Sequence, residues 1–337
     1  MDKPVLEVNH LHTYFFTDSG VVPAVEDVSF HINKGEVLGI VGESGCGKSV
    51  TSLSVMGLVP SPPGKIVDGE IIYRGSGNID TEEDLVKVTP KRIRQIRGNK
   101  IAMIFQEPMT SLDPLFSIGN QISEALFNHT TLSKQEARQK SIGMLKLVGI
   151  PRAEAIVDEY PHQLSGGMRQ RVMIAIAMSC DPEILIADEP TTALDVTIQA
   201  QILEIMKRLN KEQGTAIMLI THDLGVVAEI CDRVSVMYAG QVVEEADVRT
   251  ILKEPKHPYT QGLIKSLPKI YGREKRLYSI PGNVPKPGSI QNGCRFADRC
   301  PEVFDRCRQE SPELLSIGEG HQCRCFLYAR KEEVDHV

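Results

Sequence analysis

The sequence predicts an α/β protein with an irregular C-terminal tail, and three observations lead to this fold class. Short apolar runs typical of buried parallel strands occur at residues 36–41, 184–187 and 216–220. Segments with helical periodicity occur at residues 49–58, 120–150 and 199–209. After Lys253, closely spaced prolines interrupt any regular pattern. Strands that alternate with helices predict a parallel sheet covered by helices.

Length and composition limit the classes of protein that fit. The chain has 337 residues, which predicts about two domains or one domain with a long appendage. Hydrophobic residues make up 41% and charged residues 24%, as in an ordinary globular protein. The formal net charge is −6, Trp is absent and aromatic residues are 5%. These values argue against a chain that coats nucleic acid, because that role needs a net basic face or an aromatic stacking platform.

The sequence shows no pattern for entering a membrane. Its apolar runs fall far short of the roughly 20 residues that a spanning helix needs. Residues 1–4 are not followed by the apolar run of a signal peptide. We therefore expect a cytosolic chain whose eight cysteines are mostly reduced thiols.

Three further elements are predicted from local patterns. Residues 5–8 and 24–32 predict strands on either side of a loop that contains Asp18-Ser19-Gly20. Residues 234–244 predict a hairpin around Ala239-Gly240. Residues 90–100 carry five basic and no acidic residues. In a chain of net negative charge, this favours a solvated helix face over a nucleic-acid patch.

A phosphate-binding pattern, G-x-x-x-x-G-K-[ST], lies between a predicted strand and a predicted helix. It consists of Gly42, Glu43, Ser44, Gly45, Cys46, Gly47, Lys48 and Ser49, and Val50 completes the predicted nucleotide-binding set. The glycines let backbone N–H groups turn toward phosphate oxygens, and the helix adds its positive N-terminal end. Lys48 is expected to reach the β- and γ-phosphates and Ser49 to ligate Mg²⁺. The flanking strand and helix favour this reading over a mere tight turn.

An acidic pair follows the apolar run at residues 184–187. Asp188 and Glu189 then lie at the C-terminal end of a strand, where α/β sheets bind ligands. Asp188 is expected to join the Mg²⁺ shell and Glu189 to polarise the attacking water. Alone, such a pair is usually a solvated strand end. Together with the phosphate loop, it predicts a P-loop nucleotidase.

Further motifs resemble those of ATP-binding-cassette (ABC) proteins. Residues 164–171, Leu-Ser-Gly-Gly-Met-Arg-Gln-Arg, resemble the family's signature sequence and include Ser165, Gly166, Gly167 and Gln170. A Ser-Gly-Gly helix cap is the alternative, and the order of the other motifs argues against it. Those motifs place Gln106 in the Q-loop, Asp195 in the D-loop, His222 at the switch position and Phe15, with Tyr14 as the alternative, on the adenine. The resemblance covers residues 5 to about 250.

The resemblance implies a fold and a mechanism. The fold has a RecA-like core, an antiparallel β part and a helical subdomain at about residues 107–175. Two such domains pair head to tail, and each ATP lies between the phosphate loop of one chain and the signature of the other. Gln106 would contact the Mg²⁺ region, and His222 would contact the γ-phosphate. ATP binding would close the pair, and hydrolysis would reopen it.

The tail resembles the C-terminal extension of oligopeptide and dipeptide importer ATPases. Lys256–Thr260 resembles its His-Pro-Tyr motif, and residues 293–301 resemble its cysteine motif. The expected domains are therefore an ABC ATPase domain at 1–255 and a cysteine-rich extension at 256–337. The expected cysteine set is Cys294, Cys300, Cys307 and Cys325, with Cys323 as an extra thiol.

Four clustered cysteines predict a metal centre that fastens a tail with little apolar core of its own. A reducing cytosol disfavours disulfides, and the wide spacing favours an iron–sulfur cluster over zinc. The resemblance points to [4Fe–4S], with Zn²⁺ as the alternative.

The resulting hypothesis is the ATPase of a peptide importer, bound as a peripheral protein to the cytosolic face of the membrane. The implied partners are a second ATPase chain of a related but different kind, two permease subunits and an extracytoplasmic binding protein. Import of nickel or another small solute is the first alternative. An ABC ATPase of DNA repair or translation is disfavoured, because the chain has no sustained heptads and a single phosphate loop. A third hypothesis is an ATPase whose turnover is gated by the redox state of the metal centre.

Overall fold

The structure is a computed structural model, and it describes residues 3–75, 82–106, 111–192, 194–267, 278–289 and 292–329. Its contacts divide the chain into two compact units. Unit 1 consists of Met1–Glu7, His31–Val37 and Ile72–Ile220. Unit 2 consists of Val8–Phe30, Leu38–Ile71 and Thr221–Val337.

Unit 1 contains the parallel strands that the sequence predicts. β6 (Ile101–Ile104), β7 (Ile184–Asp188) and β8 (Ala216–Thr221) lie in the order β8-β7-β6. Ile184 stands opposite Ile101 on one side and Ala216 on the other. Every residue of β7 and β8 is buried, which explains why these segments are apolar without alternation. The end of β4 (Gly64–Arg74) also pairs here, with β5 (Glu82–Asp84).

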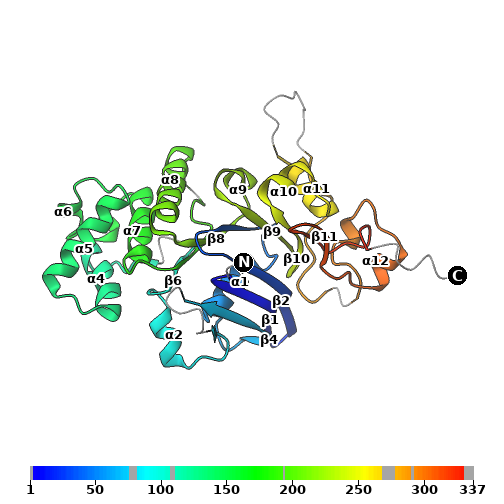
Figure 1. Ribbon diagram of the computed structural model, residues 1–337, viewed down its shortest axis with the longest axis horizontal. Coiled ribbons are helices and arrows are strands. Elements are labelled where there is room, and N and C mark those ends of the chain that lie inside the picture. The colour runs from blue at the N-terminus through cyan, green and yellow to red at the C-terminus, as the bar shows by residue number, and fades with distance from the viewer. Residues whose placement is uncertain are drawn as a thin grey trace. The chain divides into compact units, whose positions relative to one another are not determined.

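The helices of unit 1 include a group of four that lies together in Figure 1: α4 (Ile118–His129), α5 (Lys134–Leu147), α6 (Ala153–Ile156) and α7 (Gly166–Met178). The others are α2 (Pro90–Ile96), α8 (Val196–Gln213) and the 3-10 turn η1 (Pro161–Gln163). The single helical stretch expected at 120–150 is two helices. Ser133 and Glu136 form a capping box that starts α5, so the local sequence itself ends the first helix and begins the second.

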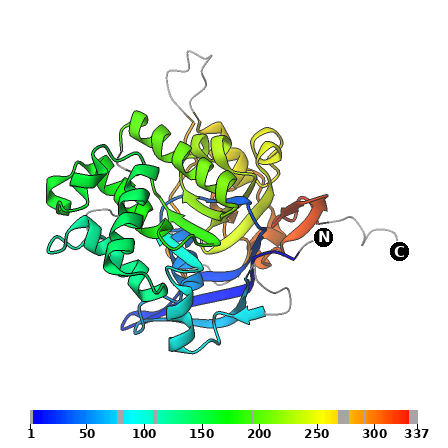
Figure 2. The same cartoon turned by 60° about the vertical axis from the view of Figure 1, so that its left-hand side comes forward.

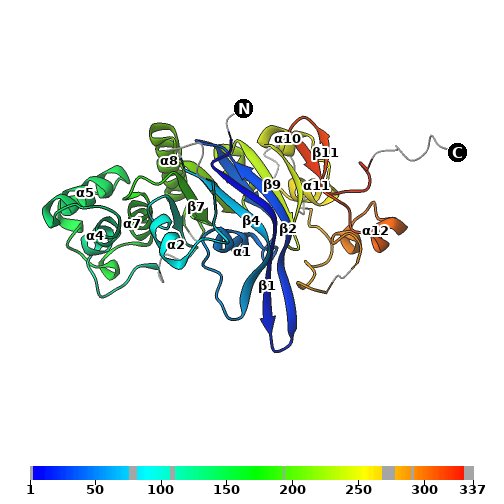
Figure 3. The same ribbon diagram turned by 60° about the horizontal axis from the view of Figure 1, so that its bottom comes forward.

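Unit 2 contains a long hairpin of β1 (Leu6–Thr17) and β2 (Gly20–Ile32), seen at the lower edge of Figure 3. Hydrogen bonding continues from β1 to β4 in the order β2-β1-β4. Both strands are longer than the segments expected at 5–8 and 24–32. Leu6 and Val8 are buried, and so are Leu11 and Thr13, so the alternation shifts by one residue around His10, whose φ is 48°. This shift and the polar residues at the tip hide the strand in the sequence.

A second set of strands in unit 2 has the order β3-β9-β10-β12-β11. β3 (Val37–Val41) is parallel to β9 (Arg233–Tyr238), and β9 forms the expected hairpin with β10 (Gln241–Asp247). β12 (His321–Cys323) and β11 (Leu315–Gly318) form a small hairpin near the C-terminus (Figure 2). Glu244 of β10 stands opposite Cys323. The tail is therefore not irregular throughout, since long-range pairing makes strands of segments too short to show a period.

The helices of unit 2 are α1 (Lys48–Val55), α9 (Leu224–Ile230), α10 (Val248–Lys253), α11 (Pro258–Lys265) and α12 (Asp305–Gln309), with a 3-10 turn η2 (Ala297–Arg299). α1 begins at the residue that follows the phosphate-binding glycines, as the pattern requires. α11 starts with His257 as N-cap and Pro258 at its first position, which has no N–H to satisfy.

Candidate functional site

The phosphate loop is a tight turn that only glycine allows. Gly42 and Gly47 have φ angles of 157° and 104°. A Cβ on Gly42 would lie 2.2 Å from the Met237 carbonyl oxygen, and one on Gly47 would lie 2.6 Å from that of Ala24. Lys48 is 5% exposed, and its Nζ donates to the carbonyl oxygens of Gly42 at 2.8 Å and Glu43 at 3.1 Å. α1 has Gly47 as N-cap and so presents its positive end without a side-chain cap.

Two residues of the loop have roles apart from phosphate. Burial raises the pKa of the Cys46 thiol, so this side chain is a small neutral filler beneath the loop. Glu43, expected in the nucleotide-binding set, directs both its backbone and its side chain to the C-terminal part of unit 2. Its N–H donates to the Tyr259 hydroxyl at 2.9 Å, and its carboxylate accepts from Arg299 at 2.7 and 3.1 Å.

The acidic pair lies where the sequence predicts, at the C-terminal end of β7 in unit 1. Asp188 is 3% exposed, and Glu189 has a left-handed φ of 47°. Such strain in a residue other than glycine is typical of functional sites. Gln106 Nε2 donates to Glu189 Oε2 at 3.2 Å, and the Thr192 hydroxyl donates to the same oxygen at 2.8 Å. The structure thus brings Gln106 to Glu189. It adds Thr192, which lies three residues before the D-loop residue Asp195.

The signature and the D-loop line one pocket of about 500 Å³ in unit 1. Ser165 is the N-cap of α7 and Asp195 is the N-cap of α8, so two helix N-termini meet at this pocket. Gly167 packs closely there, since a Cβ would lie 3.0 Å from Ile198 Cγ2. Gly166 also lines the pocket, and Gln170 is buried in α7. Each N-terminus carries a partial positive charge, and its N-cap side chain accepts one backbone N–H, that of Met168 for Ser165 and that of Ile198 for Asp195.

The remaining predicted nucleotide contacts lie in unit 2. His222 follows β8 and stands before Asp223, the N-cap of α9. Phe15 is half-buried on β1 and faces the same side as Leu11 and Thr13. Tyr14 faces the other side, beside His12, with the ring centroids 6.2 Å apart. Their roles toward a nucleotide stay predictions.

The four predicted cysteines of the tail gather at one place in unit 2. Cys294, Cys300, Cys307 and Cys325 line a narrow cavity of about 10 Å³, together with His257. Cys323 is not among the described residues that line it. Burial, followed by the neighbouring cysteines, raises the pKa of Cys294 and Cys325 to about 11. These thiols are therefore protonated near neutral pH unless a metal binds.

The cavity tests the expected metal centre. The donor type fits, since four thiols from separate segments converge. The space does not, since about 10 Å³ is room for a single water. In the described part of the chain, no group of three or more His, Cys, Asp or Glu side chains is arranged to hold a metal ion. The convergence of the cysteines is thus observed, whereas a preformed metal site is not.

Two family models match the chain. The model of ABC transporters matches residues 25–192, and that of the oligopeptide/dipeptide transporter C-terminal region matches residues 243–307. The oligopeptide transport ATP-binding protein AppD of Bacillus subtilis is 57% identical over 96% of this chain and 97% of its own length. The chain belongs to the ABC transporter ATP-binding subunits of the oligopeptide/dipeptide family. The predicted family resemblance is confirmed.

Other relatives of this ABC subunit agree. The dipeptide transport ATP-binding protein DppD of Bacillus subtilis is 48% identical over 99% of this chain and 97% of its own. Among solved structures, the dimeric cassette MJ0796, described as a bacterial ABC transporter cassette, superposes with a TM-score of 0.63 at 29% identity. The superposition covers 72% of this chain and 99% of the cassette. The predicted ABC-type α/β fold is therefore confirmed for the part that the cassette covers.

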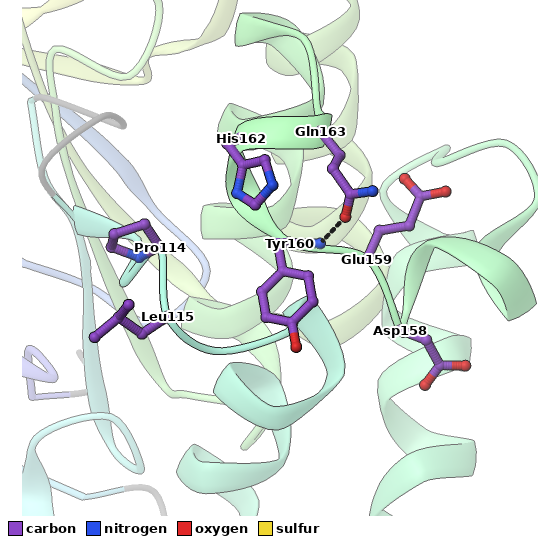
Figure 4. Close-up of a pocket in the computed structure, with 7 residues that line it drawn as sticks. All are labelled: Pro114, Leu115, Asp158, Glu159, Tyr160, His162 and Gln163. Atoms are coloured by element: carbon purple, nitrogen blue, oxygen red, sulfur yellow. Dashed lines mark hydrogen bonds between the residues drawn. The ribbon is translucent and has the colours of Figure 1, made fainter.

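The ABC subunit also has a groove of about 520 Å³ in unit 1, lined by Pro114, Leu115, Asp158, Glu159, Tyr160, His162 and Gln163. Figure 4 shows Leu115 and Pro114 on one side and the Tyr160 and His162 side chains on the other. Those two rings stack with centroids 5.8 Å apart, and Gln163 Oε1 accepts from the Tyr160 N–H at 2.7 Å. Leu115 is 79% exposed and its neighbour Phe116 is 53% exposed. Both side chains thus leave apolar area open to solvent.

Among the described residues, no helix combines the length and the apolarity that crossing a bilayer requires.

Proposed function

We propose that this chain is the ATP-hydrolysing subunit of an importer for di- and oligopeptides. The observation that carries the proposal is the presence in one chain of the ABC transporter region and the oligopeptide/dipeptide C-terminal region. Relatives of 57% and 48% identity, matched over nearly their full length, are named for oligopeptide and dipeptide transport. Binding and hydrolysis of ATP then supply the energy for moving the solute.

The proposed roles combine the motif order of the family with the chemistry of each group. Lys48 and the N–H groups of residues 42–50 bind the phosphates, with Phe15 on the adenine. Ser49, Asp188 and Gln106 supply oxygen ligands of the kind that Mg²⁺ prefers. Glu189, held by Gln106 and Thr192, polarises the attacking water, and His222 contacts the γ-phosphate.

The pocket at the start of α7 and α8 is proposed to receive the ATP of a second ATPase subunit. Ser165, Gly166 and Gly167 would face the γ-phosphate, and Asp195 would lie at the subunit boundary. Each ATP then joins two chains, and its hydrolysis releases them. The partner is proposed to be a related but different ATPase chain, paired head to tail.

Two permease subunits and an extracytoplasmic binding protein complete the proposed assembly. The groove that Leu115 and Tyr160 line is proposed to hold a cytoplasmic segment of a permease. Its wall includes the apolar side chains of Pro114, Leu115 and Tyr160. Glu159 makes its edge acidic, whereas the Asp158 carboxylate accepts two hydrogen bonds from Arg138. Cytoplasmic loops of membrane proteins are rich in Lys and Arg, so their charge complements this edge. The chain would then lie on the cytoplasmic side of the membrane as a peripheral subunit.

The domain limits are proposed as 1–255 for the ATPase, with a helical subdomain at about 107–175, and 256–337 for the extension. The two family models support a division into two regions, since one ends at 192 and the other spans 243–307, which begins 13 residues before the proposed boundary. Residues 107–110 and several segments of the extension lie outside the described residues.

Peptide uptake tests the proposed substrate class. Cells that lack this subunit are expected to lose uptake of labelled di- and oligopeptides, and expression of this chain is expected to restore it. Uptake of ⁶³Ni²⁺ is measured in the same cells as the control for the alternative substrate. Loss of nickel uptake with normal peptide uptake would contradict the peptide assignment and favour the alternative.

We also propose that the four clustered cysteines bind a [4Fe–4S] cluster, with Zn²⁺ as the alternative. The convergence of the four thiols on one cavity supports the proposal. The cavity would widen around the bound group, as metal binding often completes the folding of a small region. Bound thiolates would fasten the tail from four separate positions.

Metal analysis of anaerobically purified chain tests the cysteine proposal. We expect about four iron and four sulfide per chain, or about one zinc if the alternative holds. Cys325→Ser is expected to lose the metal, because Cys325 lines the cavity. Cys323→Ser is the matched control and is expected to keep it. A wild-type chain without metal, or equal loss in both variants, would contradict the assignment.

A further inference from the structure

We infer that Arg299 and Tyr259 of the C-terminal extension are positioning residues for the phosphate loop. The inference rests on the proposed role of residues 42–49 in binding ATP and adds two side chains to it. Both act through Glu43, the second residue of the loop, and neither is expected to touch the nucleotide.

Arg299 holds the side chain of Glu43. Its Nη1 and Nη2 donate to the two carboxylate oxygens of Glu43 at 2.7 and 3.1 Å. The Arg299 side chain is only 5% exposed, whereas that of Glu43 is 32% exposed. Hydrogen bonding to Glu43 is the main cause that raises the pKa of Arg299. A planar guanidinium with two parallel bonds fixes the orientation of a carboxylate as well as its distance.

The surroundings of Arg299 fix the guanidinium in turn. Nε donates to the Pro281 carbonyl oxygen at 2.8 Å, and Nη1 donates to the Tyr238 hydroxyl at 3.3 Å. The guanidinium carbon lies 5.7 Å from the centre of the Tyr238 ring and 5.9 Å from that of Phe296. A buried arginine restrained on three sides loses little further entropy when it holds Glu43.

Tyr259 holds the backbone of the same loop residue. Its hydroxyl oxygen accepts the Glu43 N–H at 2.9 Å, and the side chain is fully buried against Tyr238, with ring centres 4.6 Å apart. His257 Nδ1 accepts the Tyr259 N–H at 3.1 Å, and burial lowers the pKa of His257 to about 3, so this imidazole is neutral. The His-Pro-Tyr segment thereby caps α11 and directs the tyrosine hydroxyl to the loop.

A second contact from the extension supports the other half of the loop. Arg295 donates to the Ala239 carbonyl oxygen and pairs with Glu26. The next residue, Gly240, donates its N–H to the Cys46 carbonyl oxygen at 2.8 Å. The loop is therefore held at Glu43 and at Cys46, on either side of Ser44 and Gly45.

These contacts lower the entropy that the phosphate loop loses when a nucleotide binds. A loop whose peptide groups are already oriented toward the phosphates loses less conformational entropy when ATP binds. Without Arg299 or the Tyr259 hydroxyl, the free energy needed to order the loop is taken from the binding of ATP. Affinity then falls, while hydrolysis by the saturated enzyme changes little, because the reacting groups are untouched.

Equilibrium ATP titration of the full chain tests the inference, with the thermal midpoint measured alongside. A charge-assisted pair contributes about 1.5–3 kcal/mol and a neutral hydrogen bond about 0.5–1.5 kcal/mol. We therefore expect the Kd for ATP to rise roughly 10- to 100-fold in Arg299→Leu and about 3- to 10-fold in Tyr259→Phe. Arg299→Lys is expected to bind ATP more tightly than Arg299→Leu does, since lysine keeps the positive charge. It is expected to bind less tightly than the wild type, since lysine cannot form the two parallel hydrogen bonds to Glu43. In the assembled importer, KM for ATP should rise while kcat stays within about twofold.

Arg308→Leu is the matched control, because Arg308 pairs with Asp298 on the exposed surface of the same extension. It is expected to bind ATP as the wild type does. Lower thermal midpoints with unchanged Kd in both test variants would show that these residues only attach the tail, and would overturn the inference. If Arg299→Leu does not fold, the Kd of Tyr259→Phe tests the inference alone. That variant removes only the hydroxyl and keeps the buried ring. A wild-type chain that fails to bind ATP would instead overturn the proposed function.

Discussion

Replacing Glu189 with Gln is expected to lower steady-state ATP hydrolysis in the assembled importer by about 10²–10⁴-fold, the range that a general base contributes. Glutamine keeps the size of the side chain and still accepts from Gln106 and Thr192, which now hold the carboxylate. It cannot polarise water as a carboxylate does. ATP should still bind, because the phosphate loop is unchanged, so the variant is expected to accumulate as a closed ATP-bound pair. Phosphate release and size-exclusion chromatography with ATP measure the two effects.

Glu204→Gln is the control for this prediction. Glu204 is exposed on α8, so the same chemical change there is expected to leave turnover intact. If Glu189→Gln hydrolysed ATP at the wild-type rate, the role of Glu189 would be wrong. If it lost activity without holding the pair together, ATP would not be what joins the two subunits.

Replacing Leu115 with Asp is expected to detach the subunit from its permease. Leu115 is 79% exposed, so the fold has little to lose from the change. At an interface, loss of a central apolar contact costs about 2–4 kcal/mol, which weakens binding roughly 30- to 1,000-fold. The new carboxylate also adds to the negative charge of Glu159, against a basic partner. Co-purification with the permease and peptide uptake should both fall, while ATP binding by the isolated chain stays normal.

Phe127→Asp separates a specific groove from a general effect of surface charge. Phe127 is 46% exposed on α4 and does not line the groove. It is expected to keep permease binding and uptake. Equal loss in both variants, or normal assembly of Leu115→Asp, would place the permease contact elsewhere on the subunit.

The parts of the site that the sequence predicts are those whose residues are neighbours in the chain. The phosphate loop needs glycine where φ is positive, and the acidic pair follows directly on a buried strand, so both leave a local pattern. The two helices at 120–150 also have a local signal, the Ser133–Glu136 capping box, which the periodicity alone obscures.

The sequence could not predict how the tail meets the loop. Glu43 lies 216 residues from Tyr259 and 256 residues from Arg299, and contacts over such separations leave no spacing to detect. The short strand β12 likewise becomes a strand through its pairing with β10. The sequence by itself therefore determined which chemistry the chain carries, because each motif is a short contiguous stretch with its own backbone requirement. Only the tertiary structure decided which distant side chains hold that chemistry in place, because burial and hydrogen bonding between remote segments arise only on folding.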